Sequence, residues 1–265
     1  MSENDINWEK MPKKIEGGSR LKGDRRTQPL ISIITVIFRA GHELRPLIDS
    51  VLCLKDENTE FIVVDGGSED GTREILKEYE HDIDYWVSEP DRGIYDAMNK
   101  GIASAEGTFI FHLNAGDRLL YVPIRELTAA NSDSVDAAAF RVLIDGKCEF
   151  RPSYAVSLRF NNTLHHQGTF FRRQSLPAYD TKYKVFADFD VNQKLALRGA
   201  RVAIFDPVVA LHMADGVSNV PNRATISEFF HVIANNYGAT HLPIAWILCK
   251  WRGLISRLDR LRSRG

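Results

Sequence analysis

The sequence has few cysteines and no excess of charge. Its 265 residues include three cysteines, Cys53, Cys148 and Cys249, which lie far apart and form no C-x-x-C pair. An odd, scattered set excludes a disulfide scaffold and indicates a reducing compartment. Because Cys53 falls within an apolar helical pattern, we expect its thiol to be buried. The 34 basic and 35 acidic residues leave a net charge of −1, which argues against a protein that coats nucleic acid.

Long apolar runs are also absent. No uninterrupted run approaches the ~18 residues that a membrane-spanning helix requires. The first 28 residues are polar and charged and contain no apolar core of a secretory signal. These absences predict a cytoplasmic protein. With 44% apolar and 26% charged residues, the composition is that of an ordinary globular chain, which excludes collagenous, disordered and coiled-coil classes.

Several widespread nucleotide-binding and catalytic motifs do not occur. After the first predicted strand, residues 38–42 read Phe-Arg-Ala-Gly-His instead of Gly-x-Gly-x-x-Gly, which disfavours a dinucleotide-dependent dehydrogenase. The sequence has no Gly-x-x-x-x-Gly-Lys-Ser/Thr, which argues against a phosphate loop of the NTPase type. His-Glu-x-x-His, Gly-x-Ser-x-Gly and paired-cysteine metal motifs are missing as well.

What the sequence does contain is an alternation of strand and helix patterns in its first half. Apolar, β-branched runs predict strands, and apolar residues at i, i+3 and i+4 predict helices between them. The predicted strands are 30–38, 61–64, 85–87 and 108–113, and the predicted helices are 44–52, one around 75–79, and 94–105. This order is typical of a parallel sheet with helices on both faces. Such sheets bind ligands beyond the carboxyl ends of their strands.

The alternation ends after Asp117. Segments 135–144 and 147–151, joined by Asp145-Gly146, predict a hairpin. The remaining predicted elements are a strand at 167–172, a helix at 190–198 that stops at Gly199, a strand at 201–205, and a helical tail from about residue 223. We therefore divide the chain into a polar N-terminal extension (1–28), a main domain (29–222) and a helical C-terminal segment (223–265).

Polar residues follow the ends of the second, third and fourth predicted strands. Asp65 could accept hydrogen bonds from a nucleotide base or ribose, or it could cap the glycine-rich turn that follows it. Asp91 comes after the third strand. Asn114-Ala115-Gly116-Asp117 ends the fourth strand, where Asp117 could hold a divalent cation. By itself, an ordinary turn is the more frequent explanation of the Asn114–Asp117 sequence.

Two acidic residues and two histidines are further candidates for a role in catalysis or binding. Asp188 and Asp190 stand at the start of a predicted helix, where carboxylates cap N–H groups and interact favourably with the helix dipole. In a cleft, the same field would keep Asp188 ionised and able to accept a hydroxyl proton, whereas capping suits Asp190 better. We expect a structural role for His165. His212 follows a strand, from which it could reach a metal or a diphosphate.

Taken together and in this order, the motifs resemble those of bacterial family 2 glycosyltransferases of the GT-A fold. The similarity is greatest to the short enzymes of colanic-acid, O-antigen, exopolysaccharide and glycolipid synthesis. It covers about residues 29–220, and its blocks are Ile31–Ile37, Val63–Thr72, Glu89–Gly101, Leu113–Asp117, His166-Gln167, Ala187–Asp190 and Gly216–Ser218. The resemblance implies a Rossmann-like α/β GT-A fold, with a mainly parallel central sheet flanked by helices and a C-terminal helical tail. Residues 29–120 would form the nucleotide-sugar half and residues 121–222 the acceptor half.

The resemblance also implies a nucleotide-diphosphate-sugar donor, most often a UDP-sugar, at the strand ends. Asp65 would hold the base, and Asp188 would be the catalytic base of an inverting transfer. Asp117 would take the metal-binding role of the family's Asp-x-Asp motif, with His212 as an accessory ligand of Mn²⁺ or Mg²⁺. The other implied nucleotide-sugar residues are Thr35, Arg39, Asp91, Asn99, Lys100 and Asn114, and the implied donor and acceptor pocket holds His166, Gln167 and Asp190.

One departure from the family pattern concerns the metal. The Asp-x-Asp positions read Asn114-Ala115-Gly116, and only the next residue, Asp117, is acidic. This departure leaves open a non-catalytic sugar-nucleotide-binding or scaffold protein of the same fold, against which Asp188 argues. A sugar nucleotidyltransferase is a further alternative, but its usual glycine-rich loop bearing Arg and Lys after the first strand is missing.

The C-terminal tail combines basic and apolar residues. From Lys250 onward it carries six basic residues against one acidic residue, Asp259. An apolar stripe at helical spacing consists of Trp251, Leu254, Ile255, Leu258 and Leu261. This pattern predicts an interfacial helix on an anionic membrane, although a helix packed on the protein's own core would look similar. Since the resemblance implies a lipid-linked or saccharide acceptor, we expect peripheral contact with the inner face of the cytoplasmic membrane. No nucleic-acid recognition module accompanies the basic residues.

Overall fold

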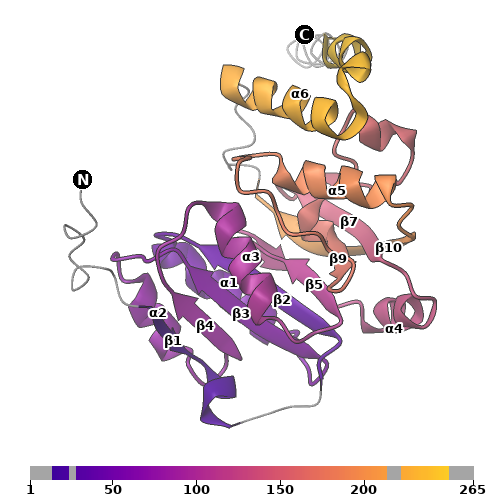
Figure 1. Ribbon diagram of the computed structural model, residues 1–265. Coiled ribbons are helices and arrows are strands. Elements are labelled where there is room, and N and C mark those ends of the chain that lie inside the picture. Colours follow the sequence, from indigo (N-terminus) through magenta and orange to yellow (C-terminus); the bar gives the residue numbers. More distant parts are fainter. Residues whose placement is uncertain (1–13, 24–27, 214–221, 251–265) are drawn as a thin grey trace, which may run out of the picture.

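The computed structural model describes residues 14–23, 28–213 and 222–250. Within them, ten strands form one sheet in the order β1-β4-β3-β2-β5-β9-β7-β10-β6, with β8 paired to β7 (Figure 1). The strands are β1 (Ile15–Gly17), β2 (Ile31–Ile37), β3 (Thr59–Asp65), β4 (Tyr85–Ser88), β5 (Phe109–His112), β6 (Arg118–Leu119), β7 (Ala137–Ile144), β8 (Cys148–Phe150), β9 (Thr169–Arg172) and β10 (Val202–His212). The α-helices are α1 (Leu44–Leu52), α2 (Thr72–Glu78), α3 (Ile94–Ser104), α4 (Ile124–Ser132), α5 (Ala187–Leu197) and α6 (Arg223–Tyr237).

The first half of the sheet is the parallel unit that the sequence predicts. Strands β4, β3, β2 and β5 lie side by side and are all parallel. Every residue of β2 and β3 is buried, as expected for strands covered on both faces. Their register pairs Ile37 with Asp65, so the two strands end at the same edge of the sheet.

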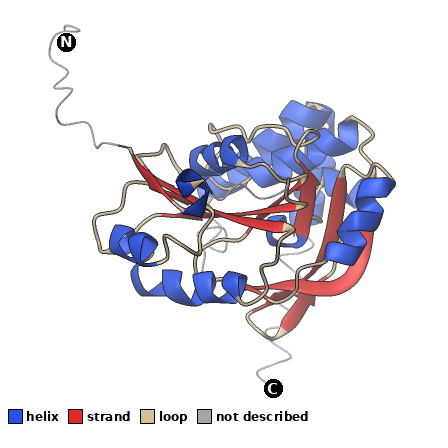
Figure 2. Cartoon of the chain, turned by 90° about the horizontal axis from the view of Figure 1, so that it is seen from below, coloured by secondary structure: helices blue, strands red, loops and turns tan. Residues whose placement is uncertain are grey.

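Helices cover both faces of the sheet (Figure 2). On one face α1, α2 and α4 contribute Leu47, Leu76 and Leu127 to a buried apolar cluster. On the other face α3 and α5 pack through Met98 and Phe189, and α6 lies over α5 (Figure 1). These two clusters confirm the predicted arrangement of a sheet between helical layers.

The second half of the sheet is mixed. Strands β7 and β8 form the predicted antiparallel hairpin, and β9 pairs antiparallel with both β5 and β7. Strand β10 runs parallel to β7 and is longer than predicted, ending at His212. The sequence does not predict β1, β6 or α4. The two strands have only 3 and 2 residues, too few to show a period.

Residues 15–22 belong to the sheet edge although they lie in the segment expected as a polar extension. Strand β1 pairs antiparallel with β4, and a 3-10 turn, η3 (Ser19–Lys22), follows it. The indole of Trp86 lies so close to Gly17 that a Cβ there would come within 2.6 Å of it. Glycine at this position therefore allows the edge strand to approach β4.

The expectation for Cys53 is wrong. Its side chain is exposed because α1 ends at Leu52 and Cys53 only caps the helix. The apolar face of α1 holds Leu44, Leu47, Ile48 and Val51. Cys53 follows Val51 by two positions, which turns it about 200° around the helix axis and away from the sheet.

The C-terminal segment begins as a helix where the sequence predicts one. Asn222 and Thr225 form a capping box at the start of α6. A 3-10 turn, η8 (Ala239–His241), then leads into helical residues 242–250. Among the described residues, no helix is both long and apolar enough to cross a bilayer. Residues 251–265, with the predicted apolar stripe, and Gly216–Ser218 lie outside the described residues.

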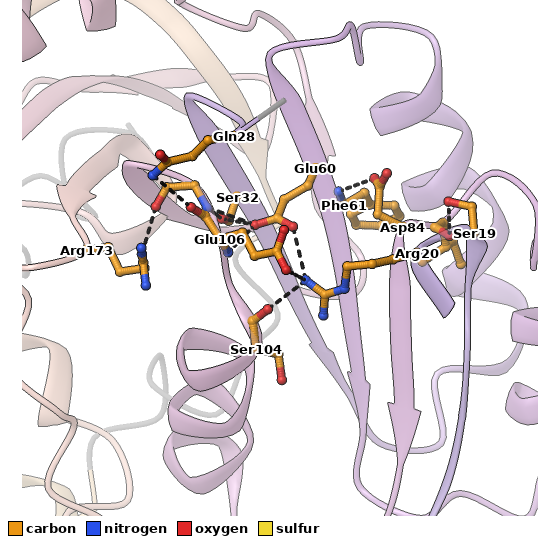
Figure 3. A network of polar contacts seen from close by, with 12 residues as sticks. Ser19, Arg20, Gln28, Ser32, Glu60, Phe61, Asp84, Ser104, Glu106 and Arg173 are labelled. Atoms are coloured by element: carbon orange, nitrogen blue, oxygen red, sulfur yellow. Dashed lines mark hydrogen bonds and ion pairs between the residues drawn. The ribbon is translucent and has the colours of Figure 1, made fainter. Parts of the chain in front are cut away.

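A polar network ties the amino ends of the strands together, at the edge opposite to the polar strand ends (Figure 3). Glu60, at the start of β3, is only 6% exposed. Its Oε1 accepts hydrogen bonds from Ser32 Oγ (2.5 Å) and from the backbone N–H groups of Glu106 (2.6 Å) and Gly107 (3.0 Å). Arg20 Nη1 lies 3.4 Å from Glu60 Oε2 and donates to Ser104 O at 2.9 Å. One carboxylate thus joins β2, β3, the start of β5 and the edge segment.

We expect Glu60→Ala to lower the free energy of unfolding by about 2–3 kcal/mol, since buried hydrogen bonds to a charged group are lost and their donors stay unsatisfied. Urea denaturation would measure the change. Glu106→Ala is the control, because the Glu106 side chain is 61% exposed and lies 3.5 Å from Arg20. It should cost no more than about 0.5 kcal/mol. An equal effect of the two substitutions would contradict the role given to Glu60.

Candidate active site

The polar residues singled out in the sequence gather at the carboxyl edge of the sheet. Strands β2, β3, β4 and β5 are parallel and end there. Because β9 is antiparallel to β5, the residues before Thr169 reach the same edge. Strand β10 ends beside β6, pairing Leu211 with Arg118, which brings His212 next to Asp117. The topology therefore assembles the site from segments far apart in the sequence.

Asp65 is fully buried and holds the turn that follows β3. Its carboxylate accepts hydrogen bonds from Ser68 N (2.9 Å), Ser68 Oγ (2.5 Å) and Ser88 Oγ (2.6 Å). This is the turn-capping role that the sequence left open, extended to the neighbouring strand β4. Base binding by Asp65 stays a prediction, and any base would have to share a carboxylate that is already hydrogen-bonded.

The loops after β2, β3 and β4 lie against one another. Arg39 has a φ of 53° and donates its backbone N–H to Ser68 Oγ at 2.7 Å. A Cβ at Gly66 would lie 2.5 Å from Asp91 Oδ2, so only glycine allows the Asp91 carboxylate this approach. Asp91 Oδ1 also accepts a hydrogen bond from Gly93 N at 2.8 Å. Arg39 and Asp91 thus lie at the predicted donor edge.

Of three other predicted donor residues, Asn99 and Lys100 have structural partners, whereas the Thr35 hydroxyl has none among the described residues. Thr35 lies wholly buried within β2. Asn99 clamps the backbone of Tyr179, donating to Tyr179 O at 2.8 Å and accepting from Tyr179 N at 2.9 Å. Lys100 Nζ donates to Pro90 O at 2.7 Å and lies 3.0 Å from Glu89. The structure does not bring Thr35 or Asn99 to the open edge, and Lys100 fixes the loop that carries Asp91.

A second cluster surrounds Asp117, whose side chain is only 3% exposed. Asp117 Oδ1 lies 3.0 Å from His212 Nδ1 and accepts a hydrogen bond from Met213 N at 3.0 Å. The Gln167 amide donates to Asp117 Oδ2. The structure therefore joins Asp117, His212 and Gln167, three residues that the sequence singled out separately.

Asp188 lies in the first turn of α5 and connects to the same edge through His166. Asp188 Oδ2 accepts a hydrogen bond from Asn162 Nδ2 at 2.8 Å and lies 3.4 Å from His166 Nδ1. The other ring nitrogen, His166 Nε2, is 3.2 Å from Asn114 Nδ2. Because Asn114 donates to Nε2, the network assigns the proton of neutral His166 to Nδ1, facing Asp188. Asp188 Oδ1 also accepts a hydrogen bond from Phe189 N at 2.8 Å, so three neighbours hold the carboxylate, whose side chain remains 13% exposed.

Asp190 does not join this cluster. It is buried under α6, where Asn236 Nδ2 donates to its Oδ1 at 3.0 Å and Lys194 Nζ lies 2.7 Å from its Oδ2. The expected capping role is wrong, because α5 begins at Ala187 and Asp190 therefore lies inside the helix and not at its N-cap. Helical geometry explains why Asp190 does not join the cluster, since residues two apart point to nearly opposite sides. Asp188 and Asp190 therefore face different neighbours.

Two further histidines, the buried His112 and the half-buried His165, lie next to residues of this site. His112 is fully buried, packs edge-on against Tyr179 at 5.6 Å, and finds no hydrogen-bond partner among the described residues. Burial lowers the pKa of His112 to about 3, so the ring is neutral. Burial, followed by the imidazoles of His166 and His212, likewise lowers the pKa of His165 well below its usual range. His165 therefore adds no charge to the site, in keeping with the structural role expected for it.

The residues around Asp117 fit a divalent cation. Asn114 Oδ1 and Gln167 Oε1 are buried and have no hydrogen-bond partner within the part of the chain that the structure describes. Amide and carboxylate oxygens are hard ligands that suit Mg²⁺ or Mn²⁺, and imidazole suits Mn²⁺. Across residues 14–23, 28–213 and 222–250, no three His, Cys, Asp or Glu side chains gather into a complete metal cage. A cation here would therefore also need oxygens from a bound substrate.

Comparison with known proteins identifies the family. The model of "Glycosyl transferase family 2" matches residues 32–189, which span the parallel half of the sheet and end just after Asp188. The chain belongs to glycosyl transferase family 2. This confirms the resemblance drawn from the motifs and favours a glycosyltransferase over the nucleotidyltransferase and non-catalytic alternatives.

Relatives of this glycosyltransferase carry the same kind of name. A "PGL/p-HBAD biosynthesis glycosyltransferase" of Mycobacterium tuberculosis is 28% identical over 249 residues, which covers 89% of this chain and 96% of the relative. An uncharacterized glycosyltransferase of the same species is 42% identical over 91 residues, 34% of this chain and 35% of the relative.

Solved structures confirm the GT-A fold of the family 2 enzyme. The S. aureus TarS fragment 1–349 in complex with UDP-GlcNAc has a TM-score of 0.60 at 16% identity, covering 78% of this chain and 66% of that chain. A longer TarS structure is covered over only 39% of its length. The mannosyltransferase PcManGT from Pyrobaculum calidifontis, in complex with GDP-Man and Mn²⁺, has a TM-score of 0.52 at 20% identity, covering 79% of this chain and 62% of that one.

Sequence reasoning missed Asn162 and Asn192. Asn192 Nδ2 donates to Asn162 Oδ1 at 2.8 Å, and Asn162 in turn donates to Asp188. The position of Asn192, four residues after Asp188, is a signal in the sequence, because residues at i and i+4 share a helix face. Asn162 lies in a loop, where no period identifies it.

The buried His112 predicts a specific pH dependence of stability. Its pKa in the folded protein is lowered to about 3 from the ordinary histidine value of about 6.5, so its contribution to stability is fully present only above about pH 6.5. As the pH falls, the unfolded chain takes up a proton that the folded chain does not. We expect about 2 kcal/mol of stability to be lost through this group between about pH 6.5 and 4.5.

His112→Phe should remove this contribution to the loss of stability at acid pH. Urea denaturation at several pH values would measure the free energy of unfolding. Phenylalanine keeps an aromatic ring against Tyr179, so we expect stability at neutral pH to be unchanged or raised. His81→Gln is the control, because His81 is exposed and should leave the pH dependence as in the wild type. Identical pH dependence in His112→Phe and wild type would contradict the assignment.

Proposed function

We propose that this glycosyltransferase is an inverting enzyme that moves a sugar from a nucleotide diphosphate sugar, most readily a UDP-sugar, to a hydroxyl of a lipid-linked or saccharide acceptor. One observation carries the proposal: the Asp188 carboxylate is held at the same sheet edge as the Asp117–His212–Gln167 cluster. His166 and Asn114 link the two, since Asn114 O accepts a hydrogen bond from Asp117 N at 3.2 Å. The named complexes of TarS with UDP and UDP-GlcNAc support a UDP-sugar, while that of PcManGT with GDP-Man leaves GDP-sugars to be tested.

The chemistry assigns one step to Asp188. As the acceptor hydroxyl attacks the anomeric carbon, Asp188 takes its proton while the bond between that carbon and the diphosphate oxygen breaks. The new glycosidic bond forms on the opposite face, so the anomeric configuration inverts and no covalent intermediate with the enzyme is needed. Asn162 and His166 orient the carboxylate, which leaves oxygen lone pairs free for the incoming hydroxyl.

The leaving diphosphate would lie against the Asp117 cluster. Asp117 and His212, with the amide oxygens of Asn114 and Gln167, would hold a divalent cation, which when bound supplies Lewis-acid neutralisation of the departing charge. This replaces the family's Asp-x-Asp pair by one carboxylate and neutral oxygens. Arg39 and Asp91 would line the nucleotide at the neighbouring strand ends, together with Asp65.

The C-terminal helix supports a peripheral place on the membrane, where a lipid-linked acceptor would be found. In residues 242–250, Ala245 packs into the core and is 1% exposed, whereas Ile244, Trp246, Ile247 and Leu248 are 50%, 56%, 48% and 36% exposed. The basic residues counted from Lys250 onward follow directly in the sequence. Exposed apolar side chains beside basic ones suit an anionic membrane surface. We therefore place the enzyme peripherally on the inner face of the cytoplasmic membrane, in surface polysaccharide or glycolipid synthesis.

A thermal-shift panel tests the donor site. UDP, GDP, dTDP and CMP would each be added with and without Mn²⁺, and we expect UDP with Mn²⁺ to stabilise the protein most. A ligand at ~100 times its Kd adds about 2.7 kcal/mol to the free energy of unfolding. Asp117→Ala is the variant that should lose the Mn²⁺-dependent part, whereas Glu126→Gln on α4 should keep it. Absence of any shift with all four nucleotides would overturn the donor assignment.

Vesicle binding tests the membrane surface. We expect the double substitution Trp246→Ser and Ile247→Ser to weaken binding to vesicles rich in phosphatidylglycerol by at least about 10-fold, since burial of each large apolar side chain contributes about 1.5–3 kcal/mol. Co-sedimentation measures the bound fraction. Leu21→Ser is the control, because Leu21 is 55% exposed and lies in η3, next to the edge strand β1. Equal binding by wild type and the double variant would remove this surface from the proposal.

A further inference from the structure

The carboxylate of Glu228, on α6, holds the loop that enters α5. Its Oε2 accepts a hydrogen bond from Lys184 N at 2.9 Å, and its Oε1 accepts from Val185 N and Phe186 N, both at 2.7 Å. A single side chain thus satisfies three consecutive backbone N–H groups. Hydrogen bonds of this kind to an ionised acceptor are about twice as strong as neutral ones.

Helix α5 depends on this contact because it has no side-chain cap of its own. Its N-cap residue is Phe186, which offers no hydrogen-bonding side chain. Glu228 instead binds the N–H of that residue from another helix. The N-cap position of α5, two residues before Asp188, is therefore bound by a tertiary contact and not by a side chain of its own segment.

The same loop is held from its other side by α3. Tyr95 Oη donates a hydrogen bond to Val185 O at 2.6 Å. Burial, and next the charge of Asp188, raise the pKa of Tyr95 well above its usual range, so the phenol stays protonated and able to donate. Val185 is thus bound through its N–H by α6 and through its carbonyl by α3.

Aromatic packing and a second polar contact fix α6 itself against α5. The Phe229 ring stacks on Phe189 at 5.3 Å and meets Phe186 edge-on at 5.6 Å. Asn236 Nδ2 donates to Asp190 Oδ1 and Gln193 Oε1, both at 3.0 Å. Helix α6, which carries Glu228, is therefore itself held in place against α5.

We propose that Glu228 is a positioning residue for Asp188. Helix α6 lies outside the family-matched residues 32–189, and its Glu228 sets the orientation of the general base. The proposal rests on the proposed function in that Asp188 takes the acceptor proton. Glu228 does not touch the reacting atoms and acts through the loop 184–186 and the start of α5. An error of about 1 Å in the position of a catalytic group can cost about 100-fold in rate.

The test compares Glu228→Gln, Asp188→Asn, the double variant and wild type in the full chain. Glutamine keeps the shape of Glu228, but its NH2 group cannot accept, so at least one of the three N–H groups loses its partner. We expect amide exchange in peptides covering residues 184–186 to be about 10-fold faster. We expect UDP affinity to stay within about 2-fold, since the donor loops lie elsewhere. Turnover of the sugar nucleotide selected by the thermal-shift panel should fall about 10- to 100-fold in kcat.

Two comparisons separate positioning from a general loss of stability. Adding Glu228→Gln to Asp188→Asn should lower kcat no further, because the base it positions is already removed. Glu228→Asp, which keeps the charge, should recover part of the rate. Glu126→Gln, on α4, is the matched control and should change neither exchange nor kcat; its partner is Tyr121 Oη at 3.3 Å.

Several results would overturn the inference. Unchanged exchange at 184–186 in Glu228→Gln would show that the carboxylate does not hold the loop. Faster exchange with unchanged kcat would show that the loop does not set Asp188. A further drop of 10-fold or so in the double variant would assign Glu228 an action independent of Asp188. Full turnover by Asp188→Asn with faster exchange in Glu228→Gln would instead refute the base assignment of the proposed function.

Discussion

Parallel strands must be joined by crossover connections, and this constraint shapes the whole molecule. Because β2, β3, β4 and β5 run in one direction, every segment that leaves a strand does so at the same edge, and every helix returns the chain to the other. The polar residues after the strands are therefore brought together although they lie far apart in the sequence. The mixed half of the sheet completes this edge by reversing β9, which brings His166 and Gln167 beside the end of β5.

Hydrogen-bond capacity divides the residues of this edge into two kinds. Asp65 and Asn99 already use their side-chain atoms within the protein, which makes the turn after β3 and the approach of Tyr179 rigid. Asn114 and Gln167 instead retain buried amide oxygens without a partner among the described residues. Buried polar groups are normally satisfied, and under the proposed function these two oxygens are the acceptors offered to a cation, whereas Asp65 and Asn99 form part of the frame around it.

The sequence predicted the parallel half of the fold and the site edge because both depend on local patterns. Apolar runs defined β2 and β3, and the strand ends placed Asp65, Asp91 and Asp117 at one edge. The motifs could not predict the direction in which each side chain points. Asn99 belongs to a matching block yet faces the Tyr179 backbone, and Asp190, two residues after Asp188, turns under α6. Those outcomes depend on contacts across the fold, as do the edge strand β1 and the loop residue Asn162, for which no period exists.

The order in which the chain is made gives the Glu228 contact a further meaning. The loop 184–186 and Asp188 leave the ribosome well before Glu228 does. Until α6 follows, the N–H groups of that loop lack their acceptor, and the ring of Phe189 lacks its stacking contact with Phe229. Every segment matched by the family model is complete at that stage. A nascent chain can thus contain the whole family-matched region before the start of α5 is fixed, and that start becomes fixed only after α6 has been made.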